Sequence, residues 1–441
     1  MSDVASDAVN APAPGGLSSA GPRAVVRLAA PWIALAVAFS ILPAIFNSGS
    51  ALTMLSMMGI MIVFALSYNM LLGETGLLSF GHAVYYGLGG FLAVHAMNTV
   101  IHDALPVPLV VIPLVGGFSG LLFGIIFGSV STRRAGTVFA MISLGLGELV
   151  ASSSLILRGF FGGEEGVSTN RTKLLHLFGL NFGPQIQVYY LIAGWCLLCM
   201  AAMYALTRTP FGRMCNAVRE NPERVQFVGY NPRTLRFIAF SLAGLFAGIA
   251  GALAAINFEL VNSAEVGAGQ SGVVLLAAYI GGIGSFMGPV IGAILVTWLE
   301  VMLSDVTDVW QLYFGLLFIG MVMFAPNGIA GLLTMHAPLW QAREYGSMLR
   351  LALAYLVALV PALVLLVGLI LVIEMTYHLS VKASEGTTIS VFHVALDAAS
   401  KIPWVAAAVL VLGGFWLFRL TWPVVGNAWH DALAHADGRA K

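Results

Sequence analysis

Long apolar segments, separated by short polar ones, recur from about residue 28 to residue 420. A helix needs about 20 mostly apolar residues to cross the hydrocarbon core of a membrane. Segments that reach this length clearly lie at 28–46, 51–72, 77–98, 109–130, 136–157, 188–206 and 237–257. Less regular segments follow at 271–283, 289–303 and 309–332, and a last pair lies at 351–373 and 402–420. The pattern predicts a protein built of membrane-spanning helices.

The composition supports this prediction. Hydrophobic residues make up 59% of the chain, charged residues make up 9%, and the mean hydropathy is +0.92. Soluble domains carry about 25% charged residues. We therefore expect an all-α polytopic membrane protein that lies in the lipid bilayer. The formal net charge of +0 gives no indication of a nucleic-acid partner.

The segment 271–303 can be interpreted as one long helix or as two short helices broken at the glycine-rich run 281–289. Basic residues collect on the cytosolic side of membrane proteins, which helps to decide. Arg133 and the 208–236 loop follow alternate spans, and keeping Arg350 on their side of the membrane requires the two-helix interpretation. This gives about ten core helices and two more at the C-terminus, with both chain ends in the cytosol.

The chain is expected to have three parts. Residues 1–22 are rich in Ala, Pro, Ser and Gly, which is typical of a disordered tail, here cytosolic. Residues 23–335 hold the core helices. Residues 336–441 form a C-terminal extension with two predicted spans and no recognisable motif, so that it is either a pair of peripheral helices or a docking site for a partner.

Two glycine-rich breaks, at 73–90 and 281–289, interrupt apolar segments. In membrane transporters, interrupted helices leave backbone amides and carbonyls that can bind a polar solute inside the membrane. The first break also holds hydroxyl, imidazole and phenol groups, which helix packing alone does not require. Close packing of helices through glycine is the other interpretation, above all for the second break. The candidate residues of a substrate path are Ser79, Gly81, His82, Tyr85, Gly282 and Ser285.

The polar loop 208–236 carries six arginines between two long apolar segments. Asn221 and Asn231 each precede a proline, as N-cap residues often do, and Glu223 suits the dipole of a first helical turn. The loop is therefore expected to fold into two or three short helices. It either docks on a cytosolic partner or only fixes the topology. The candidate partner-contacting residues are Arg213, Arg219, Glu220, Asn221, Glu223 and Gly229.

The chain has no sequence for ATP hydrolysis. A phosphate-binding loop needs Gly-Lys-Ser/Thr, and none of the four lysines follows a glycine. If ATP drives this protein, another chain hydrolyses it, and we expect no catalytic residue, cofactor or metal site here.

Ionisable residues deep in the predicted spans are few: His82, His95 and Glu148. A proton-driven carrier would need such groups to titrate. Glu148 is interpreted as a polar contact between helices rather than as part of a proton relay. Cys196 and Cys199 lie in an apolar helix and are interpreted as packing residues.

A family resemblance rests on six segments taken together. They are 68–83 (YNMLLGETGLLSFGHA), 139–148 (FAMISLGLGE), 217–229 (AVRENPERVQFVG), 243–252, 281–292 and 324–328. In order, over roughly residues 28–333, they resemble the permease subunits of branched-chain amino acid ABC importers. The sequence at Gly89-Gly-Phe91 departs from the family's usual ending of the first break, and the C-terminal extension continues past the family's usual end.

The resemblance implies a multi-pass protein of the bacterial inner membrane. It implies partners: cytosolic ABC ATPase subunits, a second membrane permease subunit and a periplasmic solute-binding protein. Arg219, Glu220, Asn221 and Gly229 would lie in the loop that contacts the ATPase, and Ser79, Gly81 and His82 near the translocation path.

The expected function is therefore that of a permease subunit of an ATP-driven importer for branched-chain or related amino acids. One alternative is an ion- or proton-coupled secondary transporter of small polar solutes. A membrane-embedded enzyme is a second alternative, but the histidines outside the core form no recognisable catalytic set. The sequence leaves open which solute is carried and whether the second permease is a homologue or another copy of this chain.

Overall fold

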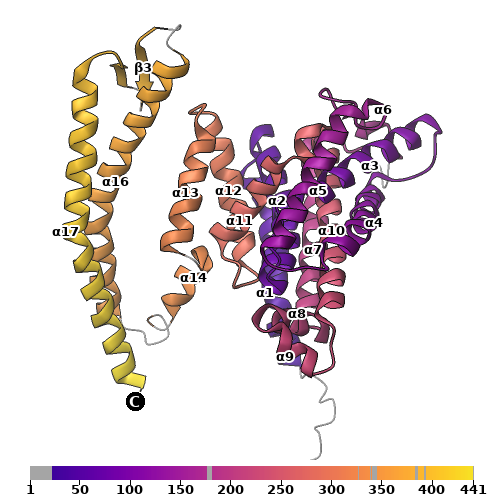
Figure 1. The fold of residues 1–441 in the computed structure, drawn as a ribbon, viewed down its shortest axis with the longest axis horizontal. Helices are drawn as coiled ribbons and strands as arrows, with labels where there is room; N and C mark the ends of the chain where they lie inside the picture. The colour runs from indigo at the N-terminus through magenta and orange to yellow at the C-terminus, as the bar shows by residue number, and fades with distance from the viewer. Residues whose placement is uncertain are drawn as a thin grey trace, which may run out of the picture. The chain divides into compact units, whose positions relative to one another are not determined.

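The computed structural model describes residues 22–175, 181–325, 327–337, 339, 345–382, 386–391 and 394–440. Most of the tail expected at 1–22 lies outside these residues. The chain divides into two compact units, 1–271 and 272–441, each of which is described by itself. Helices dominate both units (Figure 1), which confirms the all-α polytopic fold class.

The first unit consists of long helices joined by short polar segments. The long helices are α1 (Pro22–Ile45), α2 (Gly49–Thr75), α3 (Ala83–His102), α4 (Ile112–Ser131), α5 (Thr137–Ile156), α7 (Gln185–Arg208) and α10 (Pro232–Phe258). The shorter elements are η1 (Leu109–Val111), α6 (Arg158–Phe161), η2 (Arg171–Lys173), α8 (Pro210–Glu220), α9 (Pro222–Phe227) and η3 (Ser263–Val266). Two short antiparallel strands, β1 (Val167–Ser168) and β2 (Leu260–Val261), pair the connections that follow α6 and α10.

The core of the first unit contains a seam of glycines between α4 and α10. A Cβ on Gly120 would lie 2.0 Å from the carbonyl oxygen of Gly244, and a Cβ on Gly248 would lie 2.1 Å from that of Gly116. Only glycine permits such close approach of two backbones. The small-residue spacing of Gly244 and Gly248 is therefore explained by helix packing.

The same seam fixes the direction of the helices. Gly116 faces Gly248 and Gly124 faces Ser241, so α4 and α10 run antiparallel. The arginines that follow α4 are thus placed at the end of the unit where α10 begins, next to the 208–236 loop. This agrees with the expectation that Arg133 and this loop lie on one side of the membrane.

The second unit begins within α11. Its elements are α11 (Ala268–Gly281, of which the first residues belong to the first unit), α12 (Gly288–Ser304), α13 (Trp310–Phe324), α14 (Gly328–Met335), α16 (Tyr345–Val381), β3 (Thr388–Val391), β4 (Val394–Asp397) and α17 (Lys401–Ala440). The interpretation of 271–303 as two short helices is confirmed. The segment predicted as a span at 309–332 consists of α13 and α14, which are bent by 41° at a short break and so form either one broken span or a re-entrant loop.

Within the described residues, eight helices are long and apolar enough to cross a membrane, or nine if the bent α13–α14 pair counts as one span. The apolar part Ala30–Ile45 of α1 and the shorter helices α11 and α12 also coincide with predicted spans. The predicted span 77–98 differs at its start, because α3 begins only at Ala83. In the C-terminal extension, α16 and α17 pack against each other as a hairpin with β3 and β4 at its tip (Figure 1).

Candidate functional site

The first glycine-rich break turns the chain back along α2. The helix ends at Gly76, which has a φ of 70° in the left-handed region that glycine favours. The following segment then runs beside the last turns of α2, because the Tyr68 hydroxyl donates to the Ser79 carbonyl oxygen at 3.0 Å and Ser67 Oγ lies 2.9 Å from His82 Nε2. Residues 76–82, called the 76–82 segment below, are thus non-helical backbone inside the helical core.

Serines from other helices hold the far end of this segment. The Phe80 amide donates to Ser143 Oγ of α5 at 3.1 Å, and the Ala83 amide donates to Ser271 Oγ at the start of α11 at 3.0 Å. The next two amides of α3 donate to the carbonyl oxygens of Gly81 and His82. The expectation that free helix amides bind a solute is therefore wrong for the first turn of α3, whose amides already have partners.

His82 lies fully buried among aromatic rings. Its imidazole stacks on Phe64 at 5.5 Å between ring centroids, and the rings of Tyr68 and Tyr85 lie 5.3 and 5.9 Å away. Ser67 Oγ donates its single proton to the Phe64 carbonyl oxygen at 2.6 Å. It can then only accept from His82 Nε2, which leaves His82 Nδ1 as an acceptor.

Two buried polar atoms of the first break, called open atoms below, have no hydrogen-bond partner among the described residues. They are His82 Nδ1 and Ser79 Oγ, and both residues are fully buried. Leaving a buried polar group unsatisfied costs about 1–3 kcal/mol. Unpaired polar atoms in a core are therefore expected where a ligand or water completes them.

The structure brings Ser79, Gly81, His82 and Tyr85 together in this region. Gly81 allows the segment to approach the α5 backbone closely, since a Cβ there would lie 2.1 Å from the Ser143 carbonyl oxygen. Tyr85 packs its ring against Phe240 of α10 with 5.3 Å between centroids. Of these four residues, Ser79 and His82 are the ones with a buried polar atom that has no partner in the described part of the chain.

Gly282 and Ser285 belong to the second unit, where both shape the turn between α11 and α12. Gly282 has a φ of 106°, and Ser285 Oγ accepts from the Gly288 amide at 3.0 Å. A Cβ on Gly281 would lie 1.9 Å from the Gly288 carbonyl oxygen. Close packing, the alternative interpretation of the second break, thus accounts for Gly281, Gly282 and Gly288, whereas a Cβ on Gly284 would meet nothing within 4 Å.

Sequence reasoning missed Glu265 of η3. The η3 backbone lies against α3, since a Cβ on Gly87 would be 3.1 Å from the Glu265 carbonyl oxygen. Within the described residues, Glu265 Oε2 is buried without a partner, and burial raises the pKa of this carboxyl to about 8. The polar run Asn-Ser-Ala-Glu at 262–265 resembles an ordinary surface connection, and nothing in it signals burial.

The other ionisable residues that the sequence singled out are Glu148, His95 and the two cysteines of α7. Glu148 is on an exposed face of α5, and the polar contact that we expected it to make with another helix is not formed among the described residues. His95 Nε2 lies 2.7 Å from the Phe160 carbonyl oxygen of α6. Cys196 and Cys199 are buried and not disulfide-bonded, as expected of packing residues.

The 208–236 loop is folded, as its sequence predicted. The side chains of Asn221 and Asn231 accept from the amides of Arg224 and Arg233 at 3.0 and 2.9 Å and so cap α9 and α10. Val218, Val225 and Leu235 form a small buried core under α8, α9 and the start of α10. Exposed positions of the loop include Arg213, Arg219, Glu220, Asn221, Glu223 and Gly229.

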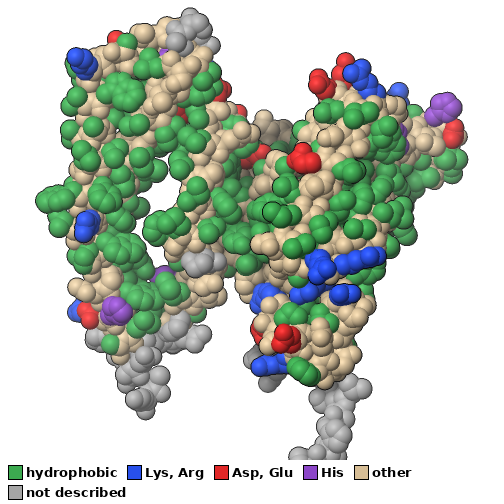
Figure 2. Space-filling view, in the orientation of Figure 1, with side chains coloured by type: hydrophobic (Ala, Val, Ile, Leu, Met, Phe, Trp, Pro, Cys, Tyr) green, Lys and Arg blue, Asp and Glu red, His purple; other side chains and the backbone are tan. Residues whose placement is uncertain are grey.

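The tip of this loop combines apolar and basic groups. The side chains of Phe227, Val228 and Tyr230 are 90%, 67% and 47% exposed. Arginine side chains gather at this end of the first unit, drawn in blue in Figure 2. Large apolar residues exposed beside charged ones are typical of protein interaction sites. Of this surface, the sequence had indicated polar residues and Gly229, but none of the large apolar side chains.

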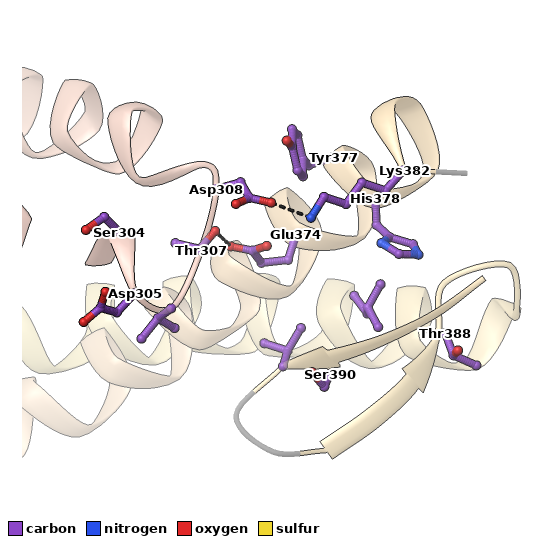
Figure 3. A pocket seen from close by; sticks show the side chains of 13 residues that line it. Ser304, Asp305, Thr307, Asp308, Glu374, Tyr377, His378, Lys382, Thr388 and Ser390 are labelled. Atoms are coloured by element: carbon purple, nitrogen blue, oxygen red, sulfur yellow. Dashed lines mark hydrogen bonds and ion pairs between the residues drawn. The ribbon is translucent and has the colours of Figure 1, made fainter. Parts of the chain in front are cut away.

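The C-terminal extension and the α12–α13 connection enclose a polar cavity of about 410 Å³ in the second unit (Figure 3). Thr307 Oγ1 and the Tyr313 hydroxyl donate to Glu374 Oε1 at 2.7 and 2.9 Å, and Lys382 Nζ lies 2.5 Å from Asp308 Oδ2. These bonds join the last turns of α16 to the α12–α13 connection and to the first turn of α13. None of the residues predicted for the substrate path or the loop lines this cavity.

Fold and site together define an all-α polytopic membrane protein in which a non-helical segment with open polar atoms interrupts the core. Residues 50–326 match the model of the family described as "Branched-chain amino acid transport system / permease component". The chain belongs to this family of membrane permease components, which supports a permease of an ABC importer. The matched residues end near the start of the C-terminal extension.

Several curated proteins are similar to this chain. The high-affinity branched-chain amino acid transport system permease protein LivM of Escherichia coli is 27% identical over 61% of this chain and 67% of its own length. BraD of Pseudomonas aeruginosa, named for the same transport, is 25% identical over 60% of this chain and 90% of its own. The fructose import permease protein FrcC of Rhizobium meliloti is 30% identical over 40% of this chain and 51% of its own. No solved structure matches this chain.

Proposed function

We propose that the chain is the permease subunit of an ATP-driven importer that carries branched-chain or related amino acids across the bacterial inner membrane. One observation carries the proposal: a helix is interrupted beside open, buried polar atoms, and a folded basic loop packs against the end of that same helix. Both termini are expected in the cytosol. ATP hydrolysis falls to a separate chain.

The chemistry of the open atoms suits a zwitterion. His82 Nδ1 can accept from an ammonium group, and the Ser79 hydroxyl can donate to a carboxylate. Aromatic rings and apolar helices around them suit an apolar side chain. A solute of no net charge needs no buried counter-ion, which agrees with the few ionisable residues in this region. The permeases for fructose and xylose among the similar proteins make a sugar the relevant competitor.

The exposed tip of the 208–236 loop supplies the ATPase contact in this proposal. Phe227 would fill an apolar groove of the ATPase, and the surrounding arginines would meet acidic groups at its rim. A second permease subunit and a periplasmic solute-binding protein complete the complex. Gly282 and Ser285 are kept as candidates for the substrate path, in addition to their roles in the turn.

A detergent pull-down from the native membrane tests the ATPase contact. The tagged chain is expected to retain an ATPase, and Phe227→Asp is expected to lose it. Leu105→Asp is the matched control, because it changes an exposed apolar residue in the connection after α3, away from the loop. If the unchanged chain retains no ATPase under gentle conditions, the proposal fails.

Uptake by the purified complex in proteoliposomes tests the solute and the energy source. Uptake of leucine is expected to require ATP and to resist ionophores, and uptake of xylose or fructose is expected to be absent. Uptake that needs an ion gradient and no ATPase would instead favour the secondary transporter. ATP-dependent uptake of a sugar but not of leucine would support an ATP-driven importer and contradict the proposal that its solute is an amino acid.

A further inference from the structure

Two side chains of α8 hold the C-terminal end of α2. Asn216 Nδ2 donates to Glu74 Oε2 at 2.5 Å, and a guanidinium nitrogen of Arg219 donates to the Gly73 carbonyl oxygen. Asn216 and Arg219 are three residues apart and so share one face of α8. Both bonds include a charged group, and such bonds are stronger than neutral ones.

The guanidinium of Arg219 therefore faces this chain and not a partner. The residue as a whole is exposed, but its hydrogen bond to the Gly73 carbonyl oxygen is partly buried. Its stem also lies against Gly76, since a Cβ on that glycine would be 3.1 Å from Arg219 Cγ. The residue that ends α2 and starts the 76–82 segment thus packs directly on α8.

The 76–82 segment has little freedom to absorb a shift at its start. Leu77 is fully buried, the Ser79 carbonyl oxygen is held by Tyr68, and the Phe80 amide is held by Ser143. Only two residues separate Gly76 from Ser79. A displacement of α8 against α2 must therefore move Ser79 or break one of these bonds.

We infer that Asn216 and Arg219 are positioning residues that transmit movement of α8 to the 76–82 segment and thereby open or close the site at Ser79 and His82. The inference rests on the proposed function, in which the ATPase moves the loop. It adds the contacts within this chain through which that movement would reach the site. Ser79 and His82 are fully buried here, so a solute reaches them only after such a rearrangement.

Substitution of Arg219 in the complete complex separates coupling from partner binding. Arg219→Ala is expected to keep the ATPase bound and hydrolysing ATP, while ATP-driven uptake falls about tenfold or more. Arg219→Lys is expected to restore part of the uptake, because an ammonium group can still donate to the Gly73 carbonyl oxygen. Arg133→Ala is the matched control, because Arg133 lies outside the loop and donates to the Ser129 carbonyl oxygen of α4, and its uptake should stay near that of the unchanged protein.

A second readout reports the movement itself. In Ser79→Cys protein, binding of an ATP analogue to the complex is expected to change the alkylation rate at position 79 severalfold. The same change should be absent when Arg219→Ala is added. Thermal unfolding of each variant shows that the fold is retained.

The outcomes are distinct. Loss of the ATPase from Arg219→Ala would make Arg219 a partner contact and overturn the inference, while leaving the importer in place. Full uptake by Arg219→Ala, or an unchanged alkylation response, would also overturn it. Absence of an ATPase from the unchanged protein would overturn the proposed function instead.

Discussion

The backbone of Gly81 lies against the Ser143 carbonyl oxygen, 2.1 Å from where a Cβ would stand. This contact presses the 76–82 segment onto α5 at the point where Ser143 Oγ also accepts from the Phe80 amide. The segment is therefore placed by backbone contact with α5 as much as by its hydrogen bonds.

Gly81→Ala is expected to destabilise the protein. The atom that the new methyl group meets is backbone, which cannot swing away, and overpacking of this kind costs about 1–3 kcal/mol. Thermal unfolding in detergent measures the effect. Gly145→Ala is the control, since a Cβ there meets nothing within 4 Å. Equal midpoints for the two variants would contradict the close approach at Gly81.

Ser79→Ala is expected to reduce solute uptake and leave stability unchanged or slightly higher. The Ser79 hydroxyl has no partner among the described residues, so its removal breaks no bond of the folded chain. Ser143→Ala is the matched comparison, because it deprives the Phe80 amide of its acceptor and should cost about 1–3 kcal/mol. Uptake assays and thermal unfolding check both. Normal uptake by Ser79→Ala would remove this residue from the substrate path.

Cys215 of α8 is expected to react slowly with alkylating reagents. It is 2% exposed, and burial, with a smaller effect of the nearby Glu74 carboxylate, raises the pKa of its thiol to about 12. At pH 8 its thiolate fraction would be about a thousandfold below that of an ordinary cysteine. Mass spectrometry of iodoacetamide-treated protein, folded and unfolded in SDS, measures the difference. Equal labelling in both states would show that α8 is not packed as described.

Glu265→Gln is expected to remove a pH dependence of stability. The pKa of Glu265 is raised to about 8, above its usual value near 4.5. Between these values the unfolded chain loses the proton and the folded chain keeps it, so the free energy of unfolding falls as pH rises and stays low above pH 8. Thermal unfolding midpoints at pH 5, 7 and 9 should therefore drop less for Glu265→Gln than for the unchanged protein. Parallel curves would show that Glu265 is solvated.

The sequence predicted those features that depend on local patterns. Apolar length located the helices, and the Asn-Pro pairs located α9 and α10, because each of these signals lies within a few neighbouring residues. Glycine runs located both breaks. The helix start at Ala83 was missed because the residues before it are as apolar as the helix itself.

The parts that could not be predicted depend on distant contacts. Ser143 and Ser271 meet the 76–82 segment from other helices, and Arg219 turns to a carbonyl group 146 residues away. Glu148 was expected to be inside because it lies in an apolar segment, but only packing decides which face of a helix is covered. Periodicity gave no guide for α5, whose apolar residues surround the helix.

The glycine seam between α4 and α10 restricts the movements that the first unit can make. Shear between helices proceeds when side chains at their interface exchange one set of contacts for another. At Gly116, Gly120, Gly244 and Gly248 there are no side chains to exchange, and one backbone lies on the other. We therefore expect α4 and α10 to move as one rigid body during transport. We expect the site to change its exposure from one membrane face to the other through movement of helices such as α5 and α7, whose interfaces contain side chains that can repack.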